Sequence, residues 1–207
     1  MELKPDDMAW ADRYKLLIGS VLPRPIAFVS TISPDGRPNI APFSFFTAVG
    51  SNPMTMLFCP ANHPDGSEKD TLRNAKPVAE GGSGEFVVNV VRHAYAKQMS
   101  DAAAHLPYGE SEFERVGLTP APSRVVRSPR LLESPISFEC RTLQVIRTNP
   151  GQTAAGNIVI GTVVHVHAED GVINERFHVD PAALDLVGRM GGDSYCTTRD
   201  RFTMPRI

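Results

Sequence analysis

The run Pro25-Ile26-Ala27-Phe28-Val29-Ser30-Thr31-Ile32-Ser33 decides the fold class of this chain of 207 residues. It is rich in β-branched and aromatic residues, and Pro34-Asp35-Gly36 after it is typical of a turn. We therefore expect a hairpin in which residues 39–47 pair back on this first strand. A second turn signal, Gly50-Ser51-Asn52-Pro53, leads into residues 54–59, which complete three strands in meander order.

The rest of the chain continues the β pattern, with short helices between strands. Residues 85–91, 136–148 and 157–168 are predicted strands, and a turn joins the last of them to a strand over 172–179. The predicted helices are one through 72–75 capped by Asp70, one over 92–103, and one over 111–116 that begins with a capping box. A further helix opens at Asp180-Pro181 and is ended by Gly188, Gly191 and Gly192. Residues 104–132 are polar and irregular, which predicts a lid or arm.

These elements together predict a mainly β protein, an antiparallel barrel with helices packed outside it. The length suits a single domain over residues 1–207, and the sequence has no internal repeat. Hydrophobic residues make up 42% of the chain and charged residues 21%, which excludes disordered and fibrous proteins.

The charge balance and the cysteines restrict the partners and the compartment. With 21 basic and 23 acidic side chains the formal charge is -2, which favours neither nucleic acid nor an anionic membrane. Residues 38–62 carry no charge, but their four prolines argue against a transmembrane helix. The three cysteines are far apart and odd in number, and we expect reduced thiols. With no secretory signal at the start, the expected location is the cytoplasm.

Several common catalytic motifs are missing from the sequence. It has no Gly-x-Gly-x-x-Gly after a strand, no Walker loop, no Gly-x-Ser-x-Gly and no His-Glu-x-x-His, which counts against Rossmann, P-loop, hydrolase and zincin enzymes. His165 and His167 lie two apart on a predicted strand, so their rings share a face and could bind a metal. A third ligand is missing from the local pattern, since only His178 follows at a distance. Two surface or interface histidines on a strand are therefore the preferred interpretation of the pair.

Two other stretches carry candidate binding groups. Residues 24–31 and 39–46 place small polar side chains beside an apolar, aromatic hairpin, which suits a flat heteroaromatic ligand. The alternative is a plain core hairpin in which Thr31 and Ser44 bond to the backbone. Lys69-Asp70-Thr71 offers an ammonium and a hydroxyl at a helix start, as a phosphate site does, although a solvated helix start is the usual explanation of such a tripeptide.

The motifs, taken in order, resemble those of flavin reductase-like FMN-binding proteins, in the branch related to flavoredoxin. The resemblance covers nearly the whole chain, and its motifs are residues 24–31, 35–36, 39–46, 69–71, 85–89, 111–113, 138–140 and 188–192. It implies a Greek-key split barrel, noncovalent FMN, and a homodimer whose subunits complete each other's cofactor clefts. The loop with His63-Pro64-Asp65-Gly66 and the glycine-rich residues 76–84 depart from the usual spacing, which weakens the assignment of Lys69 more than that of Thr71.

The resemblance also implies roles for individual residues. Thr31, Ser44 and the main chain of 39–45 would line the flavin ring and ribityl chain, Lys69 and Thr71 would hold the phosphate, and Arg24 would stabilise the reduced ring or reach the phosphate. The residues expected to bind the cofactor are Arg24, Ser30, Thr31, Asn39, Ala41, Pro42, Ser44, Phe45, Lys69 and Thr71.

The function implied is an NAD(P)H-dependent oxidoreductase. NADH or NADPH would give electrons to FMN, and the reduced flavin would pass them to a flavin or a protein such as a monooxygenase or electron-transfer partner. No acid–base residue is needed, because the cofactor carries the chemistry. The alternatives are a flavoredoxin-like electron carrier that does not oxidise NAD(P)H directly, and a metal-binding barrel that uses His165 and His167.

Overall fold

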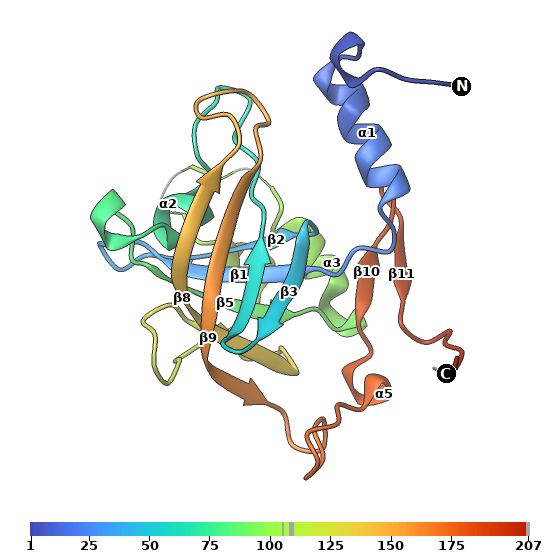
Figure 1. Cartoon of the computed structure of the whole chain (residues 1–207). Coiled ribbons are helices and arrows are strands. Elements are labelled where there is room, and N and C mark those ends of the chain that lie inside the picture. The colour runs from blue at the N-terminus through green and yellow to red at the C-terminus, as the bar shows by residue number, and fades with distance from the viewer. Residues whose placement is uncertain (105, 108–109, 206–207) are drawn as a thin grey trace.

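An antiparallel sheet of seven strands forms the body of the protein (Figure 1). The computed structural model describes residues 1–104, 106–107 and 110–205. The strand order across the sheet is β2-β1-β5-β8-β9-β4-β3, so the expected mainly β fold is confirmed. The strands are β1 (Ala27–Ile32), β2 (Pro38–Phe43), β3 (Phe46–Ser51), β4 (Met54–Phe58), β5 (Glu85–Val90), β8 (Ile136–Arg147) and β9 (Asn157–Ala168).

Short helices and two small hairpins surround this sheet. The helices are α1 (Trp10–Ser20), α2 (Asp70–Ala75), α3 (Ala96–Asp101), α4 (Glu112–Val116) and α5 (Pro181–Leu184), with single 3₁₀ turns at Pro5–Asp7, Val78–Glu80 and His93–Tyr95. One hairpin pairs β6 (Pro120–Ala121) with β7 (Arg130–Leu131), and the other pairs β10 (Val187–Arg189) with β11 (Tyr195–Thr197). Figure 1 shows α1 and the β10–β11 hairpin standing apart from the sheet. Within the described residues, none of the helices has the length and apolar character needed to cross a bilayer.

The predicted strand over 39–47 is in fact two strands at opposite edges of the sheet. β2 pairs with β1, whereas β3 pairs with β4, so the expected meander of three consecutive strands is wrong. Only Ser44 and Phe45 link the end of β2 to the start of β3, and so short a link spans about 10 Å at most. The two edges of the sheet must therefore meet at this link, which means that the sheet is rolled into a barrel.

Other predicted elements hold except where local hydrogen bonds override the pattern. β5, β8 and β9 lie within a residue of the expected bounds, and α2 includes the expected 72–75. The strand over 172–179 is wrong, because only one bridge, Ile173 to Val179, forms there. The side chain of Asn174 instead accepts the N–H groups of Arg176 and His178, which holds the segment as a tight turn.

Helix ends were predicted less well than strands. The helix over 92–103 is a 3₁₀ turn followed by the short α3, and α5 ends at Leu184 because Asp185 is left-handed, with φ 44°. Asp180 does cap α5 by accepting the Ala182 N–H at 2.8 Å. Asp70 begins α2 rather than capping it, and Ser111 makes no capping hydrogen bond to α4. The sequence patterns do not predict α1, which buries none of its residues.

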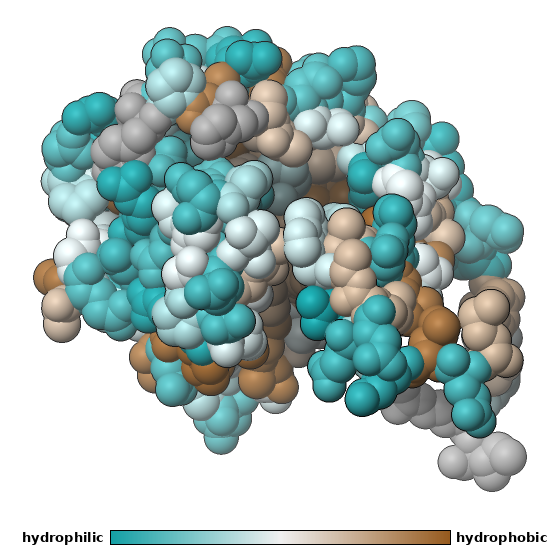
Figure 2. Space-filling model, turned by 90° about the horizontal axis from the view of Figure 1, so that it is seen from above, coloured by the Kyte–Doolittle hydropathy of each residue, from teal (hydrophilic) through white to brown (hydrophobic). Residues whose placement is uncertain are grey.

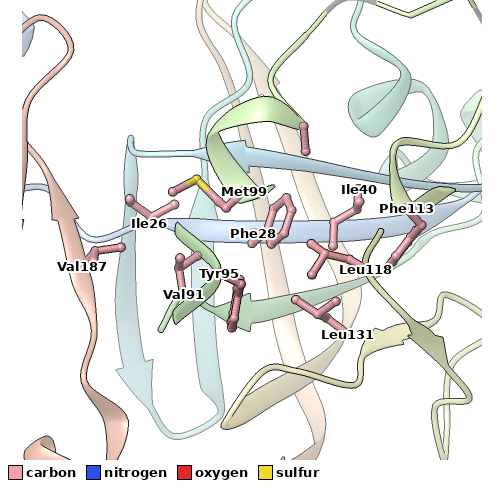
Figure 3. Close-up of a cluster of buried hydrophobic side chains, with 11 residues drawn as sticks. Ile26, Phe28, Ile40, Val91, Tyr95, Met99, Phe113, Leu118, Leu131 and Val187 are labelled. Carbon is pink, nitrogen blue, oxygen red and sulfur yellow. The ribbon is translucent and has the colours of Figure 1, made fainter. Parts of the chain in front are cut away.

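Both faces of β1 are buried, which explains the apolar run Ile26-Ala27-Phe28-Val29 at its start. On the inner face, Phe58 packs between Phe43 and Phe86, with ring centroids 5.2 and 5.1 Å away. On the outer face, Phe28 lies in a second cluster beneath α3, α4 and the arm (Figure 3). That cluster contains Ile26, Phe28, Ile40, Val91, Tyr95, Met99, Ala102, Phe113, Leu118, Leu131 and Val187. The barrel wall is thus held rigid between two apolar layers.

Gly161 on β9 lets the Phe86 ring lie against the sheet. A Cβ at this position would overlap that ring, with Cε1 only 2.6 Å away, and would stand 3.3 Å from the Arg141 carbonyl oxygen. We expect Gly161→Ala to lower the free energy of unfolding by about 1–3 kcal/mol through overpacking. Gly50→Ala on edge strand β3 is the control, since a Cβ there meets nothing within 4 Å. Urea unfolding of both variants measures the difference, and equal stability would contradict the packing argument.

Candidate functional site

A cleft of two adjoining cavities runs along β2 on the side covered by α3. The first cavity has a volume of about 340 Å³ and the second about 370 Å³. Pro42 on β2 and Ala103 just after α3 line both of them, which makes the two cavities neighbours. β2 therefore forms a shared wall, and the chemistry of the cleft changes along it.

The first cavity is lined by an ammonium group that has no counter-ion among the described residues. Lys69, just before α2, is partly buried, and its Nζ lies 6.0 Å from the centroid of the Phe43 ring. Among the residues that the structure describes, none makes a hydrogen bond or ion pair with this ammonium. Burial lowers the pKa of Lys69, as expected for a cation that lacks a partner. Arg73 lines the same cavity but pairs with Asp70, with 3.5 Å between Nη1 and Oδ1. Among the described residues, the cationic group left for an anion at this end of the cleft is therefore the Lys69 ammonium.

A buried polar network stands behind that cavity and fixes α2 against β1 and β2. Thr71 Oγ1 and Thr31 Oγ1 donate to Asn39 Oδ1 at 2.9 and 3.2 Å, and Asn74 Nδ2 donates to Thr31 at 3.0 Å. Three residues predicted to bind a cofactor, Thr31, Asn39 and Thr71, are thus brought together. Of these, Asn39 and Thr71 line the first cavity.

Glu112 on α4 completes this network and was not predicted. Its carboxylate accepts two hydrogen bonds from Asn39 Nδ2, at 2.9 and 2.8 Å, and one from the Ile40 N–H at 3.1 Å. Burial raises the pKa of Glu112, and these donors oppose that effect. Glu112 orients the Asn39 amide so that its oxygen faces the two threonine hydroxyls. Only its place in the motif at 111–113 could have drawn attention to it.

The second cavity has the chemistry of a site for a planar ring. Its apolar walls come from Ile26, Pro42 and Met99, and its aromatic walls come from Tyr14 and Tyr195. Its polar groups are the hydroxyls of Ser44 and Ser100 and the side chains of Arg189 and Asp193. Apolar faces with a few polar groups at the rim are what a heteroaromatic ligand requires.

Arg24 is placed as a structural clamp beside this cavity. Its side chain is buried, at 4% exposure, and Nε donates to Ser44 Oγ at 3.1 Å. The remaining nitrogens donate to the carbonyl oxygens of Ile18, Val21 and Met190 at 2.6 to 3.0 Å. Arg24 thereby ties the end of α1 to the segment after β10. Arg24 orients the Ser44 hydroxyl that lines the cavity, and a direct contact between Arg24 and a cofactor stays a prediction.

The other predicted site residues divide between the cleft and the core. Ala41 lines the first cavity, and Phe45 lies at the link between barrel edges, with its ring 5.9 Å from Arg24 Cζ. Ser30 is fully buried, and its hydroxyl bonds to the Pro129 carbonyl and the Asn89 amide instead. Neighbouring residues on a strand point to opposite faces, so Thr31 and Ser30 serve different sides of β1.

The two histidines proposed as metal ligands do gain a third candidate, Glu139 on β8. One ligand atom from each of Glu139, His165 and His167 lies within 4.8 Å of the others. However, the Glu139 carboxylate already accepts the backbone N–H groups of residues 124–126 and lies 2.5 Å from His167 Nε2. Two ligands 2.0–2.1 Å from a shared metal in tetrahedral geometry stand farther apart than this. The arrangement suits anchoring of the arm better than metal binding.

Comparison with known proteins places these residues in a family. The model of the flavin reductase-like domain matches residues 18–184. A curated relative, the uncharacterised protein BH2278 of Halalkalibacterium halodurans, is 40% identical over 207 residues, which is all of this chain and 96% of the relative. The match includes every cofactor-binding residue proposed from the sequence, and it extends beyond the domain at both ends.

Two solved structures are similar over almost their whole length. Nitrilotriacetate monooxygenase component B from Bacillus cereus has a TM-score of 0.90 at 32% identity, with 99% of this chain and 98% of that chain covered. The 2-nitrobenzoate 2-nitroreductase NbaA of Pseudomonas fluorescens has a TM-score of 0.87 at 29% identity, with 100% and 96% covered.

Proposed function

Because the chain belongs to the flavin reductase-like domain family, we propose that it is an FMN-binding oxidoreductase. It would take electrons from NADH or NADPH and pass them through noncovalent FMN to a flavin or protein acceptor. The whole chain, residues 1–207, would act as one domain. The observation that carries this proposal is the ammonium of Lys69, which has no described partner and lies at one end of a cleft whose other end is aromatic.

The chemistry of the two cavities sets the direction of FMN in the proposal. The phosphate would lie in the first cavity, near Lys69 and the Thr71 hydroxyl, because only that cavity offers an ammonium. The ring would lie in the second cavity, near Ser44, and the ribityl chain would pass Ala41 and Pro42. Bound FMN would supply the redox chemistry by taking up two electrons and releasing them to the acceptor. The chain itself would bind, orient and shield the flavin.

The proposed assembly is a homodimer. α1 buries no residue and exposes Trp10, Tyr14 and Leu17, each by about half of its surface. Brown apolar patches also interrupt the polar surface in Figure 2. A second copy that covers α1 would remove this apolar area from water, which favours association. Light scattering should give twice the mass of the chain, and a monomer at micromolar concentration would contradict this assembly.

The likeness to a monooxygenase component supports a monooxygenase or another electron-transfer protein as the acceptor. The proposed place of the reaction is the cytoplasm, where reduced nicotinamide nucleotides are available. The three cysteines agree with a reducing compartment, since all are free thiols.

An absorbance spectrum from 300 to 550 nm tests the proposed function. The purified protein is scanned alone, after addition of FMN, and then without oxygen after NADH or NADPH. Flavin bands that bleach with a nicotinamide are the expected result. Bands that bleach only with a chemical or protein reductant would make the protein a flavoredoxin-like carrier, and failure to bind FMN would overturn the proposal.

Adding 2-nitrobenzoate to the reduced protein tests whether a nitroaromatic acts as acceptor, as the likeness to a nitroreductase makes worthwhile.

A further inference from the structure

Two arginines lie at or beside the second cavity, and their guanidinium groups differ in burial and in hydrogen bonding. Arg24 and Arg189 are paired through their backbones, with N–H to carbonyl distances of 3.0 and 2.9 Å. The guanidinium of Arg24 is buried and bonded to three carbonyls and a hydroxyl of the chain. The side chain of Arg189 is 26% exposed and lines the cavity. The positive charge available to a ligand here is therefore that of Arg189.

The guanidinium of Arg189 is held in place by contacts that leave some of its hydrogen-bond donors available. Its Nη2 donates to the Gly192 carbonyl at 2.6 Å, and its Cζ lies 4.5 Å from the centroid of the Tyr195 ring. The Tyr195 hydroxyl in turn donates to Ser100 Oγ at 3.3 Å. Within the described part of the chain, Nε and Nη1 of Arg189 have no hydrogen-bond partner. A stacked cation with two donors left over is preorganised for a planar, electron-rich group.

We propose that Arg189 supplies the positive charge that stabilises the reduced form of a flavin bound in the second cavity. This inference rests on the proposed function and assigns to Arg189 a role that the sequence suggested for Arg24. Transfer of two electrons and one proton from a reduced nicotinamide oxidises the nicotinamide and leaves one negative charge on the flavin ring. A fixed cation beside the ring lowers the free energy of that anion and leaves the neutral, oxidised ring almost unaffected.

The consequence is a binding site that prefers reduced FMN to oxidised FMN. Because an arginine stays protonated at every working pH, the preference comes from a permanent charge and needs no proton uptake by the protein. Arg189→Gln should remove most of the preference, and Arg189→Lys should keep most of it, since the charge remains. Asp193, whose exposed carboxylate lies 3.9 Å from the guanidinium, offsets part of the charge.

The test measures the dissociation constants of oxidised and dithionite-reduced FMN for each variant. The ratio of interest is the dissociation constant of oxidised FMN divided by that of reduced FMN. We expect Arg189→Gln to reduce this ratio about tenfold, which lowers the two-electron potential of bound FMN by about 30 mV. Arg189→Lys should stay within about threefold of the wild-type ratio, because it keeps the positive charge although it loses the stacking on Tyr195. Arg176→Gln, in the exposed loop after β9, removes the same charge at a residue that does not line the second cavity, and it should leave the ratio unchanged.

Asp193→Asn keeps the inference testable if the glutamine variant does not fold. Its side chain is fully exposed, so the substitution should not affect folding, and it should shift the ratio in the opposite direction, toward reduced FMN. A wild-type ratio in both Arg189→Gln and Asp193→Asn, with FMN bound, would overturn the role of Arg189 and leave the proposed function standing. Failure of the wild-type protein to bind FMN in either state would overturn both.

Discussion

FMN should bind to the Lys69→Met variant about 10- to 150-fold less tightly than to the wild-type protein. The range corresponds to the loss of one hydrogen bond to a charged group, worth about 1.5–3 kcal/mol. Methionine keeps the length of the side chain, and it removes an ammonium that is partly buried and has the Phe43 ring as its described neighbour. Titration of the apoprotein, followed by quenching of flavin fluorescence, measures the affinity.

Riboflavin provides the decisive comparison for Lys69, because it lacks the phosphate. The Lys69→Met variant should bind riboflavin as tightly as the wild-type protein does. Lys97→Met is the matched control, since Lys97 is exposed and paired with Asp101 on α3. An equal loss of FMN and riboflavin affinity would mean that Lys69 supports the cleft rather than the phosphate, and unchanged FMN affinity would remove it from the site.

The second predicted phosphate ligand, Thr71, has a structural role that is hard to separate from ligand binding. The Thr71 hydroxyl is buried and donates to Asn39 Oδ1, so its removal disturbs the network behind the cleft as well as any phosphate contact. A double variant of Lys69 and Thr71 should cost about 2–4 kcal/mol of FMN affinity. The share of that loss due to Thr71 would also appear as lower stability of the apoprotein.

The Glu139→Gln variant should lose about 3 kcal/mol of stability at neutral pH. The carboxylate is fully buried and accepts the N–H groups of Arg124 and Val125 at 2.6 Å and of Val126 at 2.9 Å. An amide presents an NH₂ group to one side of this donor cluster and leaves a buried N–H unsatisfied. Urea unfolding measures the loss, and hydrogen exchange should become faster at residues 124–126. Glu85→Gln, which affects a single bond to the Arg127 N–H, is the control.

The stabilisation from Glu139 should also depend on pH. Burial by itself works to raise the pKa of Glu139, but the hydrogen bonds, led by that from Arg124, outweigh it and lower the pKa from 4.5 to about 2. A depressed carboxyl pKa stabilises the folded state above the unfolded pKa, and this is lost as pH falls through the folded value. The shift is worth roughly 3 kcal/mol. The gap in stability between wild type and Glu139→Gln should therefore close between about pH 5 and pH 2, and a gap that persists at pH 2 would contradict it.

Much of the barrel could be predicted from local sequence, and its closure could not. Strands such as β5 and β8 are apolar runs bounded by turn residues, so the pattern alone identifies them. The run from Asn39 to Thr47 reads as one strand because both halves favour β structure. Its break at Ser44 and Phe45 comes from pairing with β1 on one side and β4 on the other, and this long-range pairing leaves no local signal.

The residues of the candidate site also fall into two groups, those that lie in local sequence motifs and those that only the fold brings to the cleft. Lys69 and Thr71 share one sequence motif with the chemistry of a phosphate site, and both line the first cavity together with Asn39; binding of a phosphate there stays a prediction. Arg189 and Tyr195 lie about 150 residues from β2 in the sequence and reach the second cavity only through the fold. The carbonyl partners of Arg24 could not be predicted either, because every residue has a backbone carbonyl and the sequence does not indicate which of them accept a hydrogen bond.

The placement of β3 and β4 also decides when the barrel can be completed during synthesis. β4 obtains its second neighbour from β9, where Thr55 pairs with Thr162, so about 100 further residues must be made first. At roughly 5–20 residues per second, the ribosome needs about 5–20 seconds for that length. Throughout this interval the nascent hairpin presents Met56 and Phe58, both buried in the finished protein, to the cell. A chaperone that binds apolar strands close to the exit tunnel would bind this hairpin early. Pairing of β9 with β4 would later displace the chaperone.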